Sequence, residues 1–364
     1  MNEEIQGTMR ATLVVCEDNL PDAERKRDEL ESLCSTAGIK TVGWAHFKVK
    51  AINPATYIGK GQLERLLWQA RETESDLIVF NNSLSPRIQR NLEQQTDLCV
   101  IDRQEIILQI FSQRAQTREA VLQVQLARLQ YSLPRLTRRW ANLSQQRGGV
   151  RGSKGSGEKQ LELDRRAAQN RINVLKKRIA QISVQRNVQR HGRTINEIPS
   201  FAIAGYTNSG KSTLLNRLSG AGVLAQDMLF ATLDTTTRRI ELKDGTPVLV
   251  TDTVGFVSDL PHELVDAFRS TLEEAALADA LIIVLDASSP DLLIHWETTK
   301  EVLTSLNAFD KPKLVVLNKA DLLTEENMFA VQAFMAKGEK TLCLSVLHDN
   351  LDKLYAQMAE IIKM

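Results

Sequence analysis

The sequence has few features of a membrane or secreted protein. No stretch approaches the roughly 18 consecutive apolar residues of a membrane helix, and the first ten residues lack the basic start and apolar run of a signal peptide. The 4 cysteines lie far apart without a CxxC pair, and the 5 histidines are equally scattered. This spacing argues against a zinc site or a disulfide framework. We therefore expect a cytoplasmic protein that makes no membrane contact.

Acidic residues are scarce in one segment only. From Arg114 to Arg193 there are 19 Lys and Arg against 4 Asp and Glu, so this segment carries +15, whereas the remainder has 27 against 41 and carries −14. A chain of 364 residues with 43% hydrophobic residues also exceeds what one core usually contains. We expect at least two domains and a basic element mounted on an acidic body.

Alternating strand and helix patterns predict an α/β protein. Residues 1–112 indicate a small parallel α/β domain, with the apolar runs ATLVVCE, TVGWAHF, DLIVF and LCVID between amphipathic helices. Residues 199–364 show the same alternation in SFAIAGY, RRIELKD, PVLVTDT, ALIIVLDA, PKLVVLN and TLCLSVL. Asp244 and Gly245 form a hairpin turn signal between the second and third of these runs. The second region is therefore predicted to hold a mostly parallel sheet with one antiparallel hairpin.

Residues 113–198 are predicted to form a basic, antiparallel helical hairpin. One apolar stripe covers residues 122–133, and a second covers residues 168–182 at heptad spacing. Pro134 should end or kink the first helix. Five glycines within residues 148–157 exclude a stable helix at the tip.

The first chemical motif is a phosphate loop. GYTNSGKST satisfies G-x-x-x-x-G-K-[ST] and lies between a predicted strand and a predicted helix, which makes 199–364 a P-loop domain. Its backbone N–H groups surround phosphates, Lys211 acts as a catalytic cation on the β and γ phosphates, and the Ser212 hydroxyl is a magnesium ligand. The predicted nucleotide contacts are Gly205, Tyr206, Thr207, Asn208, Ser209, Gly210, Lys211 and Ser212.

The second motif, DTVG, ends the run PVLVTDT. Its carboxylate can hold magnesium, usually through water, and the N–H of Gly255 senses the γ phosphate, which gives Gly255 a catalytic role. The next residue, Phe256, stands where small GTPases carry a glutamine that orients the attacking water, so hydrolysis should be slow without a partner. His262 is interpreted as a surface residue rather than a base. The predicted contacts are Asp252, Thr253, Val254 and Gly255.

The third motif, NKAD, follows PKLVVLN and determines the base. A carboxylate at Asp321 can accept hydrogen bonds from guanine N1–H and the 2-amino group, a donor pair that adenine lacks. The alternative is that Asp321 only caps the following helix. The predicted contacts are Asn318, Lys319, Ala320 and Asp321.

The polar segment FATLDTTTR lies between the first two motifs. It should include a threonine that closes over magnesium when GTP is bound. Chemistry alone leaves four candidates open: Thr232, Thr235, Thr236 and Thr237.

The basic hairpin has the composition of a nucleic-acid contact. Cations around an aromatic ring suit phosphate contact and base stacking. The alternative is a solvated helix face, but such a face does not require acidic residues to be nearly missing. The candidate residues are Arg135, Arg138, Arg139, Trp140, Arg147, Arg151, Lys154 and Lys159.

Together these stretches resemble the HflX family of translational GTPases over nearly the whole chain. The most specific are IGKGQLERL, FNNSLSPRIQRNLE, GGVRGSKGSGEKQLELDRR, FATLDTTTR and DTVGFVSDLPHELVDAFRSTLEEA. The resemblance implies that Thr232 is the magnesium-binding threonine. It also implies nucleotide contacts at Phe230, Ala231, Thr232, Leu233, Asp234, Ser345, Val346 and Leu347. The family usually has Ser-Ala where this chain has Ser345 and Val346.

The resemblance further implies a function on the ribosome. It predicts a monomer that converts GTP to GDP with Mg²⁺, binds the large ribosomal subunit and ribosomal RNA, and dissociates or rescues stalled ribosomes. One alternative is an interaction module whose hairpin grips a protein partner while GTP times its release. Another is an RNA-remodelling ATPase based on the N-terminal domain, ranked last because residues 11–102 contain no second phosphate loop.

Overall fold

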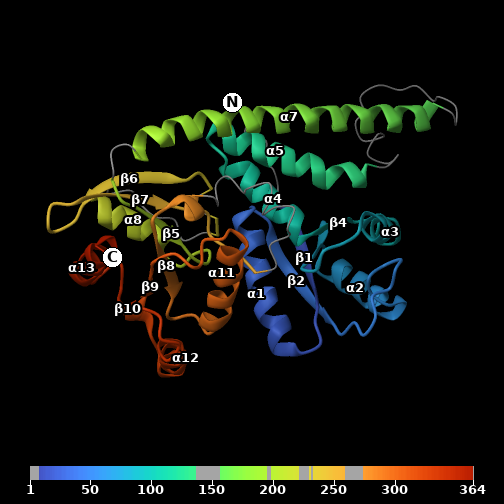
Figure 1. Ribbon diagram of the computed structural model, residues 1–364. Coiled ribbons are helices and arrows are strands. Elements are labelled where there is room, and N and C mark those ends of the chain that lie inside the picture. Colours follow the sequence, from blue (N-terminus) through green and yellow to red (C-terminus); the bar gives the residue numbers. More distant parts are fainter. Residues whose placement is uncertain are drawn as a thin grey trace, which may run out of the picture. The chain divides into compact units, whose positions relative to one another are not determined.

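The computed structural model describes residues 8–136, 156–194, 198–220, 229–230, 233–258 and 274–363, without the side chains of residues 156–161 and 183–194. It divides into two units (Figure 1). The first contains Met1–Gln113 and Gln125–Lys176, and the second contains Arg114–Val124 and Lys177–Met364. Among the described residues, no helix has the length and apolar character needed to cross a membrane.

The first unit contains a four-stranded parallel sheet in the order β2-β1-β3-β4. Its strands are β1 (Arg10–Cys16), β2 (Lys40–Phe47), β3 (Leu77–Phe80) and β4 (Cys99–Asp102), which confirms the four predicted runs. Its helices include α1 (Leu20–Thr36), α2 (Lys60–Glu72), α3 (Pro86–Thr96) and α4 (Arg103–Arg114). On one face, Val14 and Phe80 pack in a cluster with Leu66 of α2 and Leu92 of α3, all fully buried.

Local capping fixes where these helices begin. The Asn19 side chain accepts a hydrogen bond from the N–H of Asp22 at 2.8 Å, and a proline lies in the first turn of α1. Ser85 caps α3 in the same way through the N–H of Ile88 at 3.3 Å. These oxygens satisfy N–H groups that the helix itself leaves without acceptors, so each helix begins at the residue after its cap.

The basic segment forms the helices α5 (Arg118–Ser132) and α7 (Ser156–Thr194), with a 3-10 turn η1 (Leu133–Arg135) after α5. Pro134 therefore lies just beyond the end of α5, as predicted. In α7, Ile172 and Leu175 are buried, which supports the predicted apolar stripe. Gly157 is helical, so the expectation of a helix-free glycine stretch is wrong at its end, and the rest of the tip lies outside the described residues.

The second unit contains a six-stranded sheet in the order β10-β9-β8-β5-β7-β6. Only β6 runs antiparallel to its neighbour, through the predicted turn at Asp244 and Gly245. The strands are β5 (Ser200–Ala204), β6 (Thr236–Glu241), β7 (Pro247–Asp252), β8 (Ala280–Asp286), β9 (Lys313–Asn318) and β10 (Thr341–Cys343). The predicted mostly parallel sheet with one hairpin is thus confirmed.

Helices and loops complete the second unit. The helical elements described here include α8 (Lys211–Ser219), α11 (Leu292–Ser305), η2 (Ala320–Leu322), α12 (Glu325–Met335) and α13 (Asp352–Ile362). Leu214 of α8 and Leu354 of α13 pack with Ile203, Val250 and Ile282 of the sheet in one buried cluster. The carboxyl ends of β5, β7, β8 and β9 meet at one edge, where a sheet of this type binds its ligand.

Candidate nucleotide site

The phosphate loop connects the carboxyl end of β5 to the first residue of α8. Lys211 is buried, and its Nζ donates to the carbonyl oxygen of Tyr206 at 2.6 Å. Burial lowers the pKa of Lys211 to about 8, against the opposing effect of the Asp252 carboxylate. A buried ammonium at a helix N-terminus can stabilise an anion such as a phosphate.

The side chains of Ser212 and Asp252 place two oxygen atoms that can bind a metal ion next to each other. The Ser212 hydroxyl donates to Asp252 Oδ2 at 2.6 Å, and Asp252 ends β7 with 2% of its surface exposed. Hydroxyl and carboxylate oxygens are the ligand types that Mg²⁺ prefers, so this pair fits a magnesium ion. Ala231 and Thr232, which the resemblance adds to the site, lie outside the described residues.

The segment around these two residues is partly described. Phe230 and Leu233 are buried, at 2% exposure each. The Asp234 carboxylate accepts hydrogen bonds from the N–H groups of Gln116 at 2.9 Å and Thr117 at 3.0 Å, next to the start of α5. Thr237, one of the four threonines left open by the sequence, belongs to β6 and shares a 2.9 Å hydrogen bond with Thr251.

Asn318 joins two loops of the site. Its Nδ2 donates to the carbonyl oxygen of Ser209 at 2.8 Å, and its Oδ1 accepts from the N–H of Val346 at 2.8 Å. A Cβ added to Gly210 would lie 2.2 Å from Asn318 Nδ2, and the Gly210 φ of +98° is rare for other residues. Only glycine therefore allows Asn318 to reach the phosphate loop.

The base-recognition motif ends β9. Lys319 has a φ of 61°, and its Nζ lies 2.7 Å from Asp286 Oδ2. Asp321 lies in η2, and a hydrogen bond from Ser345 holds the pKa of its carboxyl below the usual value. Thr324, not Asp321, caps α12, so the interpretation of Asp321 as the cap of that helix is wrong.

The third loop presents residues of different exposure. Ser345 and Val346 are buried, whereas Leu347 is 63% exposed. The N–H of Ser345 donates to Asp349 Oδ2 at 2.7 Å. In this structure the N–H groups of Ser345 and Val346 therefore both have acceptors within the protein.

Two acidic residues of this edge were missed by sequence reasoning. Asp286 binds Lys319, and Asp349 holds the Ser345 loop. Asp286 could have been found, because it ends a strand whose neighbours both carry motifs at their carboxyl ends. Asp349 gives no comparable signal, since its role depends on how the loop after β10 turns back on itself.

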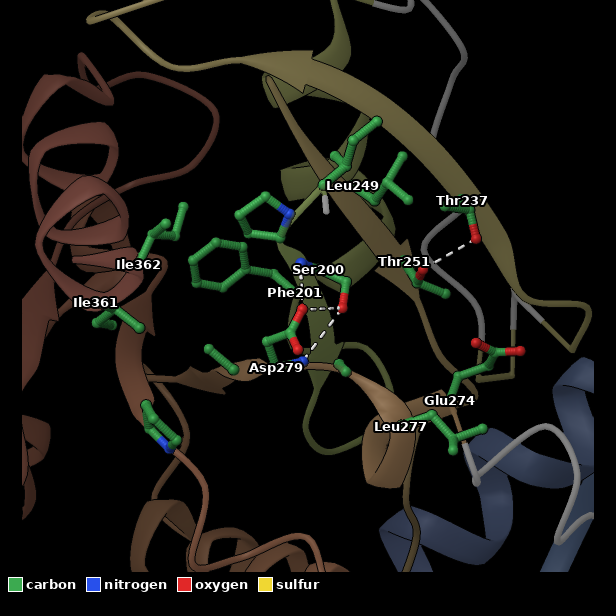
Figure 2. A pocket seen from close by; sticks show the side chains of 15 residues that line it. Ser200, Phe201, Thr237, Leu249, Thr251, Glu274, Leu277, Asp279, Ile361 and Ile362 are labelled. Atoms are coloured by element: carbon green, nitrogen blue, oxygen red, sulfur yellow. Dashed lines mark hydrogen bonds between the residues drawn. The ribbon is translucent and has the colours of Figure 1, made fainter. Parts of the chain in front are cut away.

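One pocket of the second unit lies away from these motifs. It has a volume of about 580 Å³ and begins where β5 and β8 begin, at the edge opposite to the phosphate loop. Figure 2 shows Asp279 beside Ser200, whose N–H and hydroxyl donate to the Asp279 carboxylate at 2.8 and 2.7 Å. Of the residues given a nucleotide or magnesium role by the sequence, only Thr237, one of the four threonines left open, lines this pocket.

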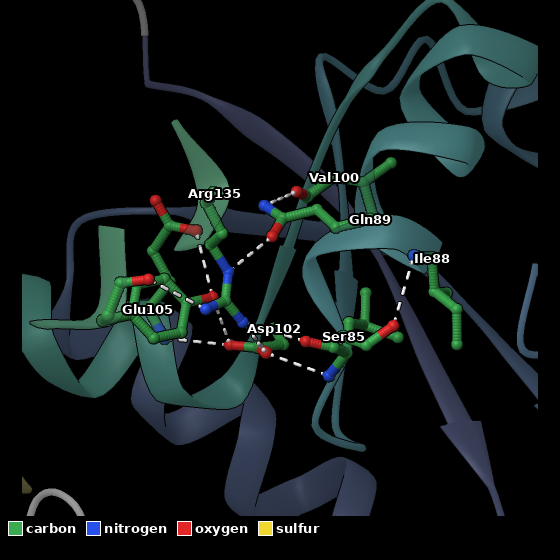
Figure 3. Close-up of polar contacts among 9 residues, drawn as sticks. Ser85, Ile88, Gln89, Val100, Asp102, Glu105 and Arg135 are labelled. Carbon is green, nitrogen blue, oxygen red and sulfur yellow. Dashed lines mark hydrogen bonds and ion pairs between the residues drawn. The ribbon is translucent and has the colours of Figure 1, made fainter. Parts of the chain in front are cut away.

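Arg135, a predicted RNA contact, makes its side-chain contacts within the first unit (Figure 3). Its guanidinium donates to Gln89 Oε1 at 2.8 Å and to the Leu84 carbonyl oxygen at 2.9 Å, and it lies 3.5 Å from Asp102 Oδ2. It also stacks over the ring of Tyr131. Because only 16% of the Arg135 side chain is exposed, its assignment as a phosphate contact is corrected to a structural one.

The fold and the site define the class of protein as a P-loop GTPase with two additional regions. A family model described as "50S ribosome-binding GTPase" matches residues 200–319. Models described as "GTP-binding GTPase N-terminal" and "GTP-binding GTPase Middle Region" match residues 24–112 and 114–193.

Similar proteins identify the family. The GTPase HflX of Akkermansia muciniphila is 49% identical over 346 residues, which cover 92% of this chain and 79% of the relative. The GTPase HflX of Escherichia coli is 42% identical, with 82% and 70% covered. A crystal structure of the SsGBP complex with GDP has a TM-score of 0.54 at 27% identity, covering 98% of this chain and 99% of that one. The chain belongs to the HflX family of GTPases, and its reaction is GTP hydrolysis.

Proposed function

We propose that this GTPase binds the large ribosomal subunit and that its GTP cycle times the dissociation or rescue of stalled ribosomes. The observation that carries this proposal is the match of residues 200–319 to a family described as a 50S ribosome-binding GTPase. The charge of +15 on the segment from Arg114 to Arg193 supports it, because ribosomal RNA is a polyanion.

Each nucleotide motif has a proposed role in this cycle. Asp321 accepts from the guanine N1–H and 2-amino groups, while Asn318 holds the base loop against the phosphate loop. Ser212 and Thr232 would hold Mg²⁺ directly, and Asp252 would hold it through water. The ion would neutralise charge on the β and γ phosphates, next to Lys211.

The proposal includes slow hydrolysis without a partner. Phe256 is 1% exposed, and its apolar ring cannot orient water through a hydrogen bond. Turnover by the protein alone should be on the order of 10⁻⁴ to 10⁻² per second, the range of unassisted switch GTPases. Large ribosomal subunits should raise it by completing the site.

Exposed cations on α7 support contact with RNA. Ile172 and Leu175 of this helix are buried, whereas every described basic side chain on it is exposed. These residues are Arg165, Arg166, Arg171, Lys176, Lys177 and Arg178. One of them, Arg166, forms an ion pair with Glu162 at 3.0 Å.

Cosedimentation with purified large ribosomal subunits tests the proposal. The full chain should sediment with the subunits in a non-hydrolysable GTP analogue and be released in GDP. Hydrolysis should rise when the subunits are added. Equal sedimentation in the GTP analogue and in GDP, together with a hydrolysis rate that the subunits do not change, would contradict a GTP-timed action on this subunit.

The salt dependence of the same binding identifies what the basic segment contacts. Replacing Arg147, Arg151, Lys154 and Lys159 by alanine should make the logarithmic salt slope shallower by about three units, at ~0.7 per phosphate contact. A matched control removes four exposed cations of the first unit: Lys40, Lys60, Arg87 and Arg90. If both variants keep the parental slope, the basic segment does not contact RNA and the protein-partner alternative is favoured.

A further inference from the structure

The phosphate loop and the DTVG segment are joined beyond the ends of their strands. β5 and β7 are parallel neighbours whose pairing ends at Ile203 and Asp252. An isolated bridge then links Tyr206 with Phe256. The N–H of Phe256 donates to the Gly205 carbonyl at 3.1 Å, and the N–H of Thr207 donates to the Phe256 carbonyl at 2.7 Å. The residues after DTVG thus pair with the phosphate loop as if both strands continued.

The side chain of Tyr206 fixes this pairing. Its hydroxyl accepts a hydrogen bond from the N–H of Ser258 at 2.7 Å and shares a second one with Ser258 Oγ at 2.7 Å. Its ring stacks on His295 of α11, with the centroids 3.8 Å apart and an interplanar angle of 17°. Tyr206 is 6% exposed, so this contact is shielded from water. The tyrosine therefore connects the phosphate loop to the second residue after Phe256.

The same pairing places Gly255 next to the ammonium of Lys211. A Cβ added to Gly255 would lie 2.9 Å from Lys211 Nζ and 2.8 Å from Thr207 Cγ2. In a GTP complex the lysine must reach the β and γ phosphates. Here Lys211 donates to the Tyr206 carbonyl instead, and the Gly255 backbone lies against the ammonium.

We infer that Tyr206 is a positioning residue whose hydroxyl latches residues 253–258 over the phosphate loop and so disfavours GTP relative to GDP. The closed segment occupies the space next to Lys211 that a γ phosphate requires. GDP has no γ phosphate and binds with the segment closed or open. GTP binds only to the open arrangement, so its apparent affinity equals its intrinsic affinity multiplied by the fraction of protein that is open.

Replacing Tyr206 by phenylalanine tests the latch. The variant Tyr206→Phe keeps the ring stack on His295 and removes both hydrogen bonds to Ser258. The full chain should bind a non-hydrolysable GTP analogue about fivefold more tightly, as expected for the loss of about one net hydrogen bond from the closed form, while its GDP affinity changes less than about twofold. An equal shift for both nucleotides, no shift, or weaker binding of the analogue would overturn the inference.

Two further variants separate the latch from a general structural effect. Tyr355→Phe removes another tyrosine hydroxyl of the same unit, which donates to the Leu218 carbonyl at 3.2 Å, and should leave the ratio of GTP to GDP affinity unchanged. Ser258→Ala removes only the Oγ partner and should give a smaller shift than Tyr206→Phe. In the Tyr206→Phe background, Ser258→Ala should add nothing, because the two side chains act through one contact. Additive shifts would contradict the latch.

Discussion

The two parallel sheets of this protein have contrasting carboxyl edges. In the first unit, Asp102 at the end of β4 is completely buried and receives hydrogen bonds from the N–H of Leu84 at 3.0 Å and the hydroxyl of Tyr131 at 2.9 Å. In the second unit, Asp252 at the end of β7 faces Ser212 and a glycine-rich loop that leads into α8. Long side chains fill the carboxyl edge of the first sheet, which we call the filled edge. Backbone turns line the carboxyl edge of the second sheet, which we call the open edge.

This difference explains why the second sheet carries the phosphate-binding motif. A phosphate needs backbone N–H groups that turn inward around it, and the loop between β5 and α8 provides such a turn. In the first unit, β1 leads into α1 through Glu17, Asp18 and Asn19, without a glycine, and α4 follows β4 directly. These two connections of the first unit therefore lack the glycine-rich turn of a phosphate loop.

The largest expected effect is on stability, at the filled edge. Arg135→Ala would leave Asp102 buried without its cation, which should lower the free energy of unfolding of the first unit by about 3 kcal/mol. Chemical denaturation of the full chain measures this change, and GDP affinity should stay at the parental value. As a control, Arg128→Ala removes an arginine of α5 that donates to Ser112 Oγ at 3.0 Å in an exposed contact. Equal effects of both variants would show that the edge is not specially stabilised.

The next effect is on base selection, at the open edge. Asp321→Asn should weaken GTP binding about a hundredfold, because an amide cannot accept from both guanine donors and one N–H stays unsatisfied in the complex. The same amide can donate to an oxo group at position 2, so binding of xanthosine triphosphate should improve. Nucleotide titration measures both, with Asp310→Asn as an exposed control at the other end of β9. Unchanged GTP affinity would contradict the role of Asp321.

The sequence predicted one edge well and the other poorly. At the open edge, each motif is contiguous, so GYTNSGKST, DTVG and NKAD could be placed from the strand that precedes each. The filled edge depends on Asp102, Gln89 and Arg135, which come from three elements and meet only through tertiary packing. Arg135 was therefore interpreted from its basic neighbours as an RNA contact. Composition describes a segment, but it does not show which of its charges have partners.

The smallest of these effects concerns the magnesium ligand at the open edge. Ser212→Ala removes the hydroxyl that now donates to Asp252. Of the proposed ligands, the ion would keep Thr232 directly and Asp252 through water, so it should be held less well. The magnesium concentration needed for half-maximal GTP binding should rise about tenfold, the lower end of what a change in a metal site costs. Ser219→Ala, at the other end of α8, removes a hydroxyl that donates to the Leu215 carbonyl and should leave this concentration unchanged. Without magnesium, the parent and Ser212→Ala should bind GTP equally. If the two proteins still differ in GTP affinity when a chelator has removed the magnesium, Ser212 contacts the phosphates directly. The open edge would then differ from the filled edge by its phosphate site and not by a metal site.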